Sequence, residues 1–133
     1  MNTKAKIIKE MQKNVYEANL FLPKAGLVKL TWGNVSQINR ELGLIVIKPS
    51  GVPYEKMQEA DMVVTDLSGK VLQGELNPSS DLPTHCVLYQ KFPEIGAVVH
   101  THSKWAVCWA QAGRGISAYG TTHADTFYGT VPC

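Results

Sequence analysis

The chain has 133 residues, of which 44% are hydrophobic and 18% charged, the size and balance of one globular domain with a buried core. Its 13 basic and 11 acidic residues are scattered and give a net charge of +2, so no basic strip predicts nucleic-acid binding. No apolar stretch suits a signal peptide or membrane span, and three widely spaced cysteines without a CxxC pair argue against disulfides or a thiolate zinc site. We therefore expect a cytoplasmic protein with reduced thiols that binds neither nucleic acid nor membrane, and whose mild basicity suits small anions.

The first half of the sequence predicts a helix followed by two β-hairpins. Apolar side chains recur at helical spacing from Asn2 to about Leu22, and Pro23 and Gly26 then close this amphipathic helix. Short runs of apolar and β-branched residues predict the strands, and a proline-containing loop at 49–53 separates the two pairs. The runs are 35–38 with 44–47, and 62–67 with 71–73.

The second half predicts a helix, a strand and another helix. A polar loop precedes the first helix, which Ser80 or Asp81 can cap and which has Pro83 in its first turn, running to about Phe92. A buried strand over 95–102 and an apolar helix over 105–112 follow. This order predicts an α/β layered fold, a sheet covered by helices.

Two histidines at the end of the predicted strand are the most informative residues. Side chains two apart on a strand project from one face, so His100 and His102 can bind a single metal ion, although a polar strand end is an open alternative. Asp81 can add a carboxylate oxygen, and helix capping would also explain it. His85, one helical turn later, can orient that carboxylate or ligate; an ordinary i, i+4 helix pair is the simpler reading, and we leave His85 outside the ligand set.

Three short loops carry hydroxyl, amide and backbone N–H groups of the kind that bind phosphate oxygens. Each is also an ordinary turn, and no Walker-type glycine loop indicates a nucleotide. The loops contain Gly33 with Asn34, Ser50 with Gly51, and Ser79 with Ser80.

Asp125 ends a polar run that begins at Thr121. A carboxyl group there can exchange a proton with a sugar hydroxyl if it lies near the metal. A solvated loop carboxylate explains the residue equally simply, and the sequence by itself favours that reading.

Five short motifs follow one another along the chain: Thr31-Trp32-Gly33-Asn34, Lys48-Pro49-Ser50-Gly51, Pro78-Ser79-Ser80-Asp81, Val99-His100-Thr101-His102 and Gly120-Thr121-Thr122-His123-Ala124-Asp125. Together they resemble the motifs of the bacterial L-ribulose-5-phosphate 4-epimerases, members of the class II aldolase family. The resemblance covers nearly the whole chain, and it is specific because all five motifs occur in the same order.

The resemblance implies a three-layer α/β/α fold with a largely antiparallel central sheet, formed by residues 1–133 as the N-terminal portion of one domain. It also implies a homotetramer with active sites between neighbouring subunits, and a zinc ion that manganese or cobalt can replace. The implied roles are metal ligation by Asp81, His100 and His102, phosphate contacts by Asn34, Ser50, Gly51, Ser79 and Ser80, substrate contacts by Lys48 and Thr121, and acid/base catalysis by Asp125.

The implied reaction interconverts L-ribulose 5-phosphate and D-xylulose 5-phosphate in pentose catabolism. The cation stabilises an enediolate while the C3–C4 bond breaks, and the aldehyde turns over before it recombines. Aldolases of the fuculose-phosphate type, which release the aldehyde, are the nearest alternative; they typically have glutamate in place of Asp81 and lack the motif ending in Asp125.

The resemblance also implies that relatives continue beyond Cys133 with a third histidine ligand and a tyrosine that acts as a second acid/base. Two expectations of different class follow. One is an epimerase whose sequence is cut short, and the other is a non-catalytic remnant that binds metal or sugar phosphate or associates with a longer partner. An open reading frame past Cys133 with such a tail would support the first, and a stop codon the second.

Overall fold

The computed structural model describes residues 3–133, so Asn2, with which the predicted first helix begins, lies outside the described part. The chain divides into two compact units, one ending at Thr101 and one spanning His102–Cys133. Each unit is described by itself.

The first unit contains a five-stranded antiparallel sheet with the order β4-β3-β2-β1-β5. Both predicted hairpins are present, because the turns that join them suit reversal: Gly43 adopts a φ of +62°, and Asp66 accepts hydrogen bonds from the backbone N–H groups of Ser68 and Lys70. The strands are β1 (Asn34–Asn39), β2 (Leu44–Ile47), β3 (Val63–Asp66), β4 (Val71–Gln73) and β5 (Ala97–His100), and a short 3-10 helix, η1 (Glu59–Asp61), precedes β3.

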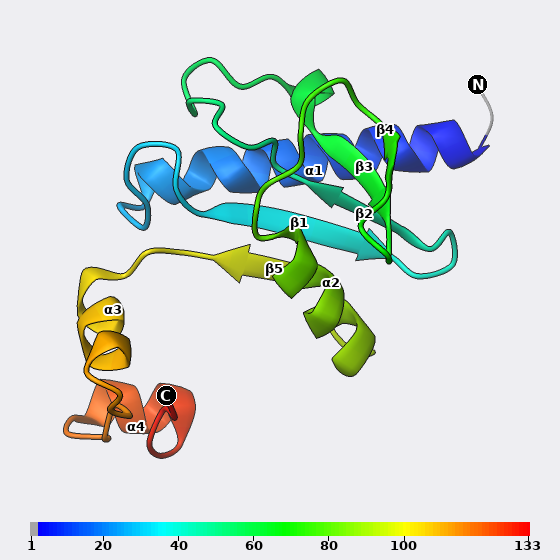
Figure 1. The fold of residues 1–133 in the computed structure, drawn as a ribbon. Coiled ribbons are helices and arrows are strands. Elements are labelled where there is room, and N and C mark those ends of the chain that lie inside the picture. The colour runs from blue at the N-terminus through cyan, green and yellow to red at the C-terminus, as the bar shows by residue number, and fades with distance from the viewer. Residues whose placement is uncertain (1–2) are drawn as a thin grey trace. The chain divides into compact units, whose positions relative to one another are not determined.

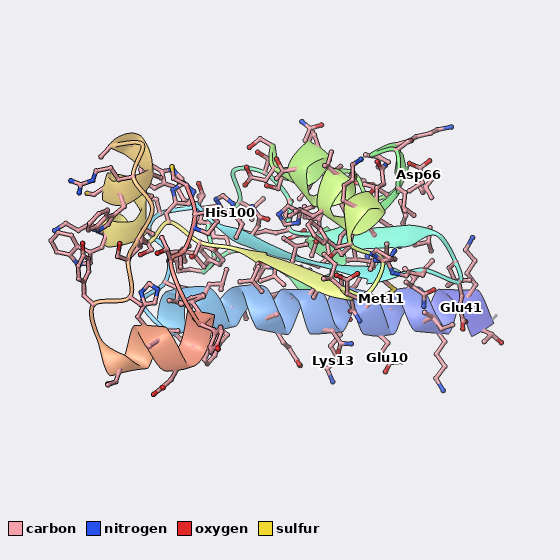
Figure 2. All side chains as sticks on the ribbon, turned by 90° about the horizontal axis from the view of Figure 1, so that it is seen from below. Glu10, Met11, Lys13, Glu41, Asp66 and His100 are labelled. Atoms are coloured by element: carbon pink, nitrogen blue, oxygen red, sulfur yellow. The ribbon has the colours of Figure 1, made fainter. Side chains whose placement is uncertain are left out.

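Two helices cover the two faces of this sheet, as Figure 1 and Figure 2 show. Helix α1 (Thr3–Lys24) packs Met11, Val15 and Leu22 against one face, and Figure 2 shows Glu10 and Lys13 pointing away from it. Helix α2 (Leu82–Lys91) packs Leu82, Cys86 and Tyr89 against the other face. Alternate residues of β2 supply the two cores, Leu44 and Val46 to one, Ile45 and Ile47 to the other. The first unit is therefore the expected three-layer α/β/α fold.

Helix α1 continues past its predicted end. Pro23 lies inside the last turn, where the missing N–H removes only one bond, and the helix ends at Lys24. Gly26 then adopts a φ of +70° while the Leu27 N–H donates to the Leu22 carbonyl over 3.0 Å, the pattern of a glycine C-cap.

Strand β5 differs from its prediction in two ways. It spans Ala97–His100, shorter than the predicted 95–102, and it is an edge strand whose exposure alternates where a buried strand was expected. Val99 is 59% exposed, and among residues 3–133 no strand pairs with β5 on its outer side. The apolar composition of this segment was read as full burial, but β5 is covered only in part: Val98 packs against the core beneath α2, and Val99 is exposed.

The second unit contains α3 (Lys104–Gln111), close to the predicted helix, and α4 (Thr121–Phe127). Ser103 caps α3 through the Ala106 N–H, and an isolated antiparallel bridge joins Ile116 to Val131. Helix α4 occupies the run read as a loop from sequence. Among the described helices, none is both long enough and apolar enough to cross a membrane.

Candidate functional site

Two of the predicted phosphate-binding loops lie side by side in the first unit. The Ser79 N–H donates to the Lys48 carbonyl over 3.0 Å, and the Ser50 N–H donates to the Asn77 carbonyl over 2.9 Å. Pro49 and Pro78 form a bridge between these bonds, although neither can donate. Ser50, Gly51 and Ser80 are exposed beside the joined loops. The fold therefore brings together two segments that lie far apart in the sequence.

Asn34 connects the third loop to the other two. Its side chain is 2% exposed, and its Nδ2 donates to Ser79 Oγ over 3.0 Å and to an Asp81 carboxylate oxygen over 2.6 Å. A carboxylate only accepts, so this contact fixes the orientation of the amide and leaves Asn34 Oδ1 buried without a hydrogen-bond partner among the described residues. Asn34 is thus the common partner of a loop serine and of the predicted carboxylate ligand.

Asp81 occupies the N-cap position of α2, but its side chain makes no capping hydrogen bond. The capping explanation left open by the sequence is therefore wrong. The carboxylate instead turns toward β1, where one oxygen is held by Asn34. Because Asn34 pairs with His100 in the β1–β5 ladder, the two side chains lie on the same face of the sheet. Asp81 and His100 are thus both neighbours of Asn34.

Lys48 lies beneath the loops and is only 2% exposed. Its ammonium donates to the carbonyls of Thr31, Pro49 and Val52, each over 3.3 Å, and lies 4.8 Å from the centre of the Tyr54 ring. Burial lowers the pKa of Lys48. Its three protons are thus used to hold the 31–33 and 49–52 loops in place.

Tyr54 reinforces the same arrangement. Its hydroxyl group lies 2.9 and 3.0 Å from the carbonyl oxygens of Trp32 and Gly33 and shares its one proton between them, and burial raises the pKa of Tyr54 to about 12. A neutral phenol is therefore available as a donor across the physiological range. Lys48, which directly follows β2, and Tyr54, in the turn after the 49–53 loop, together hold the loop before Asn34 in place.

His85 is 1% exposed and lies on α2 one turn after Asp81. Its Nδ1 lies 2.7 Å from Ser36 Oγ, so its side chain contacts the sheet and is not explained by a simple helix pair alone. Burial lowers the pKa of His85 to about 4; the Asp81 carboxylate raises this pKa and His100 lowers it, each by less than the effect of burial. The ring is accordingly neutral at physiological pH.

Three predicted residues belong to the second unit. Strand β5 ends at His100, so strand alternation does not fix the direction of the His102 side chain as the sequence argument assumed. Thr121 begins α4 and Asp125 is exposed on it, which corrects the reading of Asp125 as a loop residue. Their approach to Asp81 stays a prediction.

The donor types in the first unit, a carboxylate and an imidazole, fit a zinc-like cation. Within residues 3–133, however, no three His, Cys, Asp or Glu side chains are grouped closely enough to hold a metal ion. Asp81 and His100 would be the ligands that the first unit contributes.

Sequence reasoning missed two members of this region. Ser36 contacts both His85 and Tyr89. The sequence analysis assigned no role to Ser36 or Tyr89, because each is an ordinary residue for its strand or helix. The available signal was Ser36 itself, a hydroxyl residue between the apolar Val35 and Ile38 of the predicted strand.

The comparisons with known proteins agree with this fold. An L-fuculose 1-phosphate aldolase is 33% identical over 82% of this chain, with a TM-score of 0.77, and the match covers 51% of that aldolase chain. The YgbL protein of Escherichia coli, a putative aldolase/epimerase/decarboxylase, is 22% identical over 78% of this chain and 49% of its own, with a TM-score of 0.70. The L-fuculose-1-phosphate aldolase of Thermus thermophilus is 22% identical over 92% of this chain and 61% of its own, with a TM-score of 0.72.

This chain therefore spans about half the length of the solved structures that it matches. Residues 13–133 match the family model described as the class II aldolase and adducin N-terminal domain, whose enzymes are typically zinc-dependent and bind sugar phosphates. The chain belongs to the class II aldolase and adducin N-terminal domain family.

Proposed function

We propose that this chain forms the phosphate-binding and cation-binding side of an L-ribulose-5-phosphate 4-epimerase. The observation that carries the proposal is the double hydrogen bond of Asn34, which links a serine of the joined loops to the Asp81 carboxylate. A phosphate and a cation bound on either side of this amide would be held at opposite ends of one small substrate. Such positioning is what a retro-aldol and aldol sequence on a sugar phosphate needs.

The joined loops are suited to the phosphate end. The exposed Ser50 and Ser80 hydroxyl groups can donate to phosphate oxygens, and the buried Lys48 ammonium adds positive charge beneath the loops. The proposed phosphate contacts are Asn34, Ser50, Gly51, Ser79 and Ser80.

Asp81, His100 and His102 are the proposed ligands of a zinc ion, for which manganese or cobalt would also suit the donors. A bound cation would supply Lewis-acid stabilisation of negative charge on the substrate oxygens. Asn34 holds one Asp81 oxygen by a charge-assisted bond, which leaves the other oxygen for the proposed cation. Thr121 is a proposed substrate contact, and Asp125 a proposed proton donor and acceptor at the aldehyde.

A fuculose-phosphate-type aldolase is the second candidate, and the 33% identity to such an enzyme favours it. The two activities differ in whether the aldehyde is released or recombined. The aspartate at position 81 and the carboxylate at position 125 support the epimerase, because inverting C4 needs a proton exchanger near the aldehyde.

The test compares this 133-residue chain with a version extended by the second half of a family member. The proposed assembly is a homotetramer with sites between subunits, so both forms are assayed at matched oligomeric state. We expect the extended form to convert L-ribulose 5-phosphate to D-xylulose 5-phosphate, and Asp81→Asn to remove this activity. Release of free aldehyde from L-fuculose 1-phosphate with no epimerisation would establish the aldolase alternative, and no turnover of either substrate would reject both.

A further inference from the structure

A buried polar cluster between α2 and the sheet has no part in the function proposed above. Ser36, His85 and Tyr89 are each no more than 1% exposed. Ser36 Oγ lies 2.7 Å from His85 Nδ1 and 2.7 Å from Tyr89 Oη. The serine hydroxyl thus fixes the His85 ring through one of its two nitrogens.

The second nitrogen of His85 is the unexplained part of this cluster. His85 Nε2 is buried and has no hydrogen-bond partner among the residues that the structure describes. A buried polar atom of this kind is rare in a native interior unless a water or ligand supplies the partner. Ser36 already occupies Nδ1, so the partner of Nε2 has to come from the opposite edge of the ring.

Two predicted ligands lie within electrostatic reach of that ring. Asp81 is one helical turn before His85, whose N–H donates to the Asp81 carbonyl over 3.1 Å, and the Asp81 and His100 side chains both interact electrostatically with the imidazole. Ser36 and Asn34 are two apart on β1 and face the same side, so the cluster and the Asn34–Asp81 contact are adjacent. A water between His85 and the carboxylate would satisfy Nε2.

We propose that His85 is a positioning residue for the cation site: Ser36, held in turn by Tyr89, anchors Nδ1, and Nε2 orients the Asp81 carboxylate through a bound water. This inference rests on the proposed cation site. Partners that hold a ligating side chain in place commonly change metal affinity by about 10- to 100-fold when removed. The bond of His85 Nδ1 to Ser36 and the proposed bond of Nε2 to the water can be tested separately, because they use different nitrogens.

The experiment measures Co²⁺ binding by the 133-residue chain and two matched variants, using visible absorption and calorimetry. In His85→Asn the amide can reach only the Nδ1 position and keep the bond to Ser36, whereas in His85→Gln it reaches the Nε2 position. We expect His85→Asn to bind Co²⁺ about 10- to 100-fold more weakly and His85→Gln to bind close to the level of the starting chain. Circular dichroism and urea unfolding confirm that both variants are folded.

Retained affinity in His85→Asn, or an equal loss in both variants, would overturn the positioning role while leaving the cation site intact. No Co²⁺ binding by the starting chain would overturn the cation site and this inference together. If the variants do not fold, ¹⁵N NMR of the starting chain decides: saturation with Zn²⁺ should move the His85 Nε2 resonance and leave Nδ1 bonded to Ser36. An unchanged Nε2 resonance would refute the proposal.

Discussion

Replacing Gly33 with alanine should disturb the junction between the loop before β1 and the end of β5. Gly33 has a φ of +76°, which side chains other than glycine rarely adopt. A Cβ atom added there would lie 2.9 Å from the backbone carbonyl oxygen of His100 and would also overlap the Val28 side chain. The valine can rotate, but the carbonyl belongs to a paired strand and can move only with β5.

Gly26 provides a matched control for the free-energy cost of the left-handed backbone conformation alone. Its φ is +70° and a Cβ there would meet nothing within 4 Å. Gly26→Ala should therefore cost only the left-handed conformation, about 1–2 kcal/mol of unfolding free energy. Gly33→Ala adds the steric conflict, about 1–3 kcal/mol more, for a total of about 2–5 kcal/mol.

The assay is urea denaturation of both variants and the starting chain, followed by far-ultraviolet circular dichroism and tryptophan fluorescence. We expect Gly33→Ala to unfold at clearly lower urea concentration than Gly26→Ala, with a similar slope. Equal midpoints for the two variants would show that the His100 carbonyl does not limit space at Gly33. That outcome would refute the close approach on which the placement of His100 beside this loop depends.

Three further predictions concern buried polar groups. Asn19→Ala should lower the unfolding free energy by about 2–3 kcal/mol in urea titrations, because the Asn19 amide is the side-chain partner of the Val35 N–H and carbonyl. Tyr54→Phe should cost about 1 kcal/mol in the same titrations, and a loss near zero would show that its two bonds to loop carbonyls do not stabilise the fold. The folded-state pKa of His85 is about 4, below its ordinary 6.5, so the unfolded chain takes up the proton first as pH falls. Stability present above pH 6.5 should therefore decline toward pH 4, by up to about 3 kcal/mol, and His85→Gln should lack this share of the decline in pH-dependent unfolding.

The fold was largely accessible from the sequence because its signals are local. Both hairpins follow from β-branched runs separated by turn residues, and α1 from an apolar stripe with helical period. The exposure of β5 could not be predicted from the sequence, because the same apolar run can form a central strand or an edge strand. Helix α4 was missed for a related reason: threonine-rich, polar sequence gives no periodic apolar signal.

The candidate site was accessible only in part, because its contacts join distant segments. Sequence motifs singled out Asn34 as a phosphate contact and Asp81 as a metal ligand. No sequence pattern predicts that the Asn34 amide donates a hydrogen bond to the Asp81 carboxylate, 47 residues further along the chain. Lys48 was expected to touch substrate, and the structure shows its donors on loop carbonyls. Its side chain stabilises the loops whatever further contact it makes.

The distribution of buried polar atoms gives an independent reason to place the site at this end of the sheet. Strand β1 begins at this end, and β2 and β5 end there, because Ser36 pairs with Ile47 and Asn34 pairs with His100. Helix α2 also starts there, because Asn34 binds Asp81 at its N-cap. Burying a polar group costs free energy unless partners surround it, so a fold selected for stability alone would favour apolar residues at such positions. Five buried polar side chains nevertheless gather at or beside this end: Asn34, Ser36, Lys48, Ser79 and His85. Two of them retain a buried atom without a described hydrogen-bond partner, and a bound ligand or water would satisfy those atoms. Local departures from the most stable choice are expected where a protein binds something, and three of these five residues, Asn34, Lys48 and Ser79, belong to the motifs.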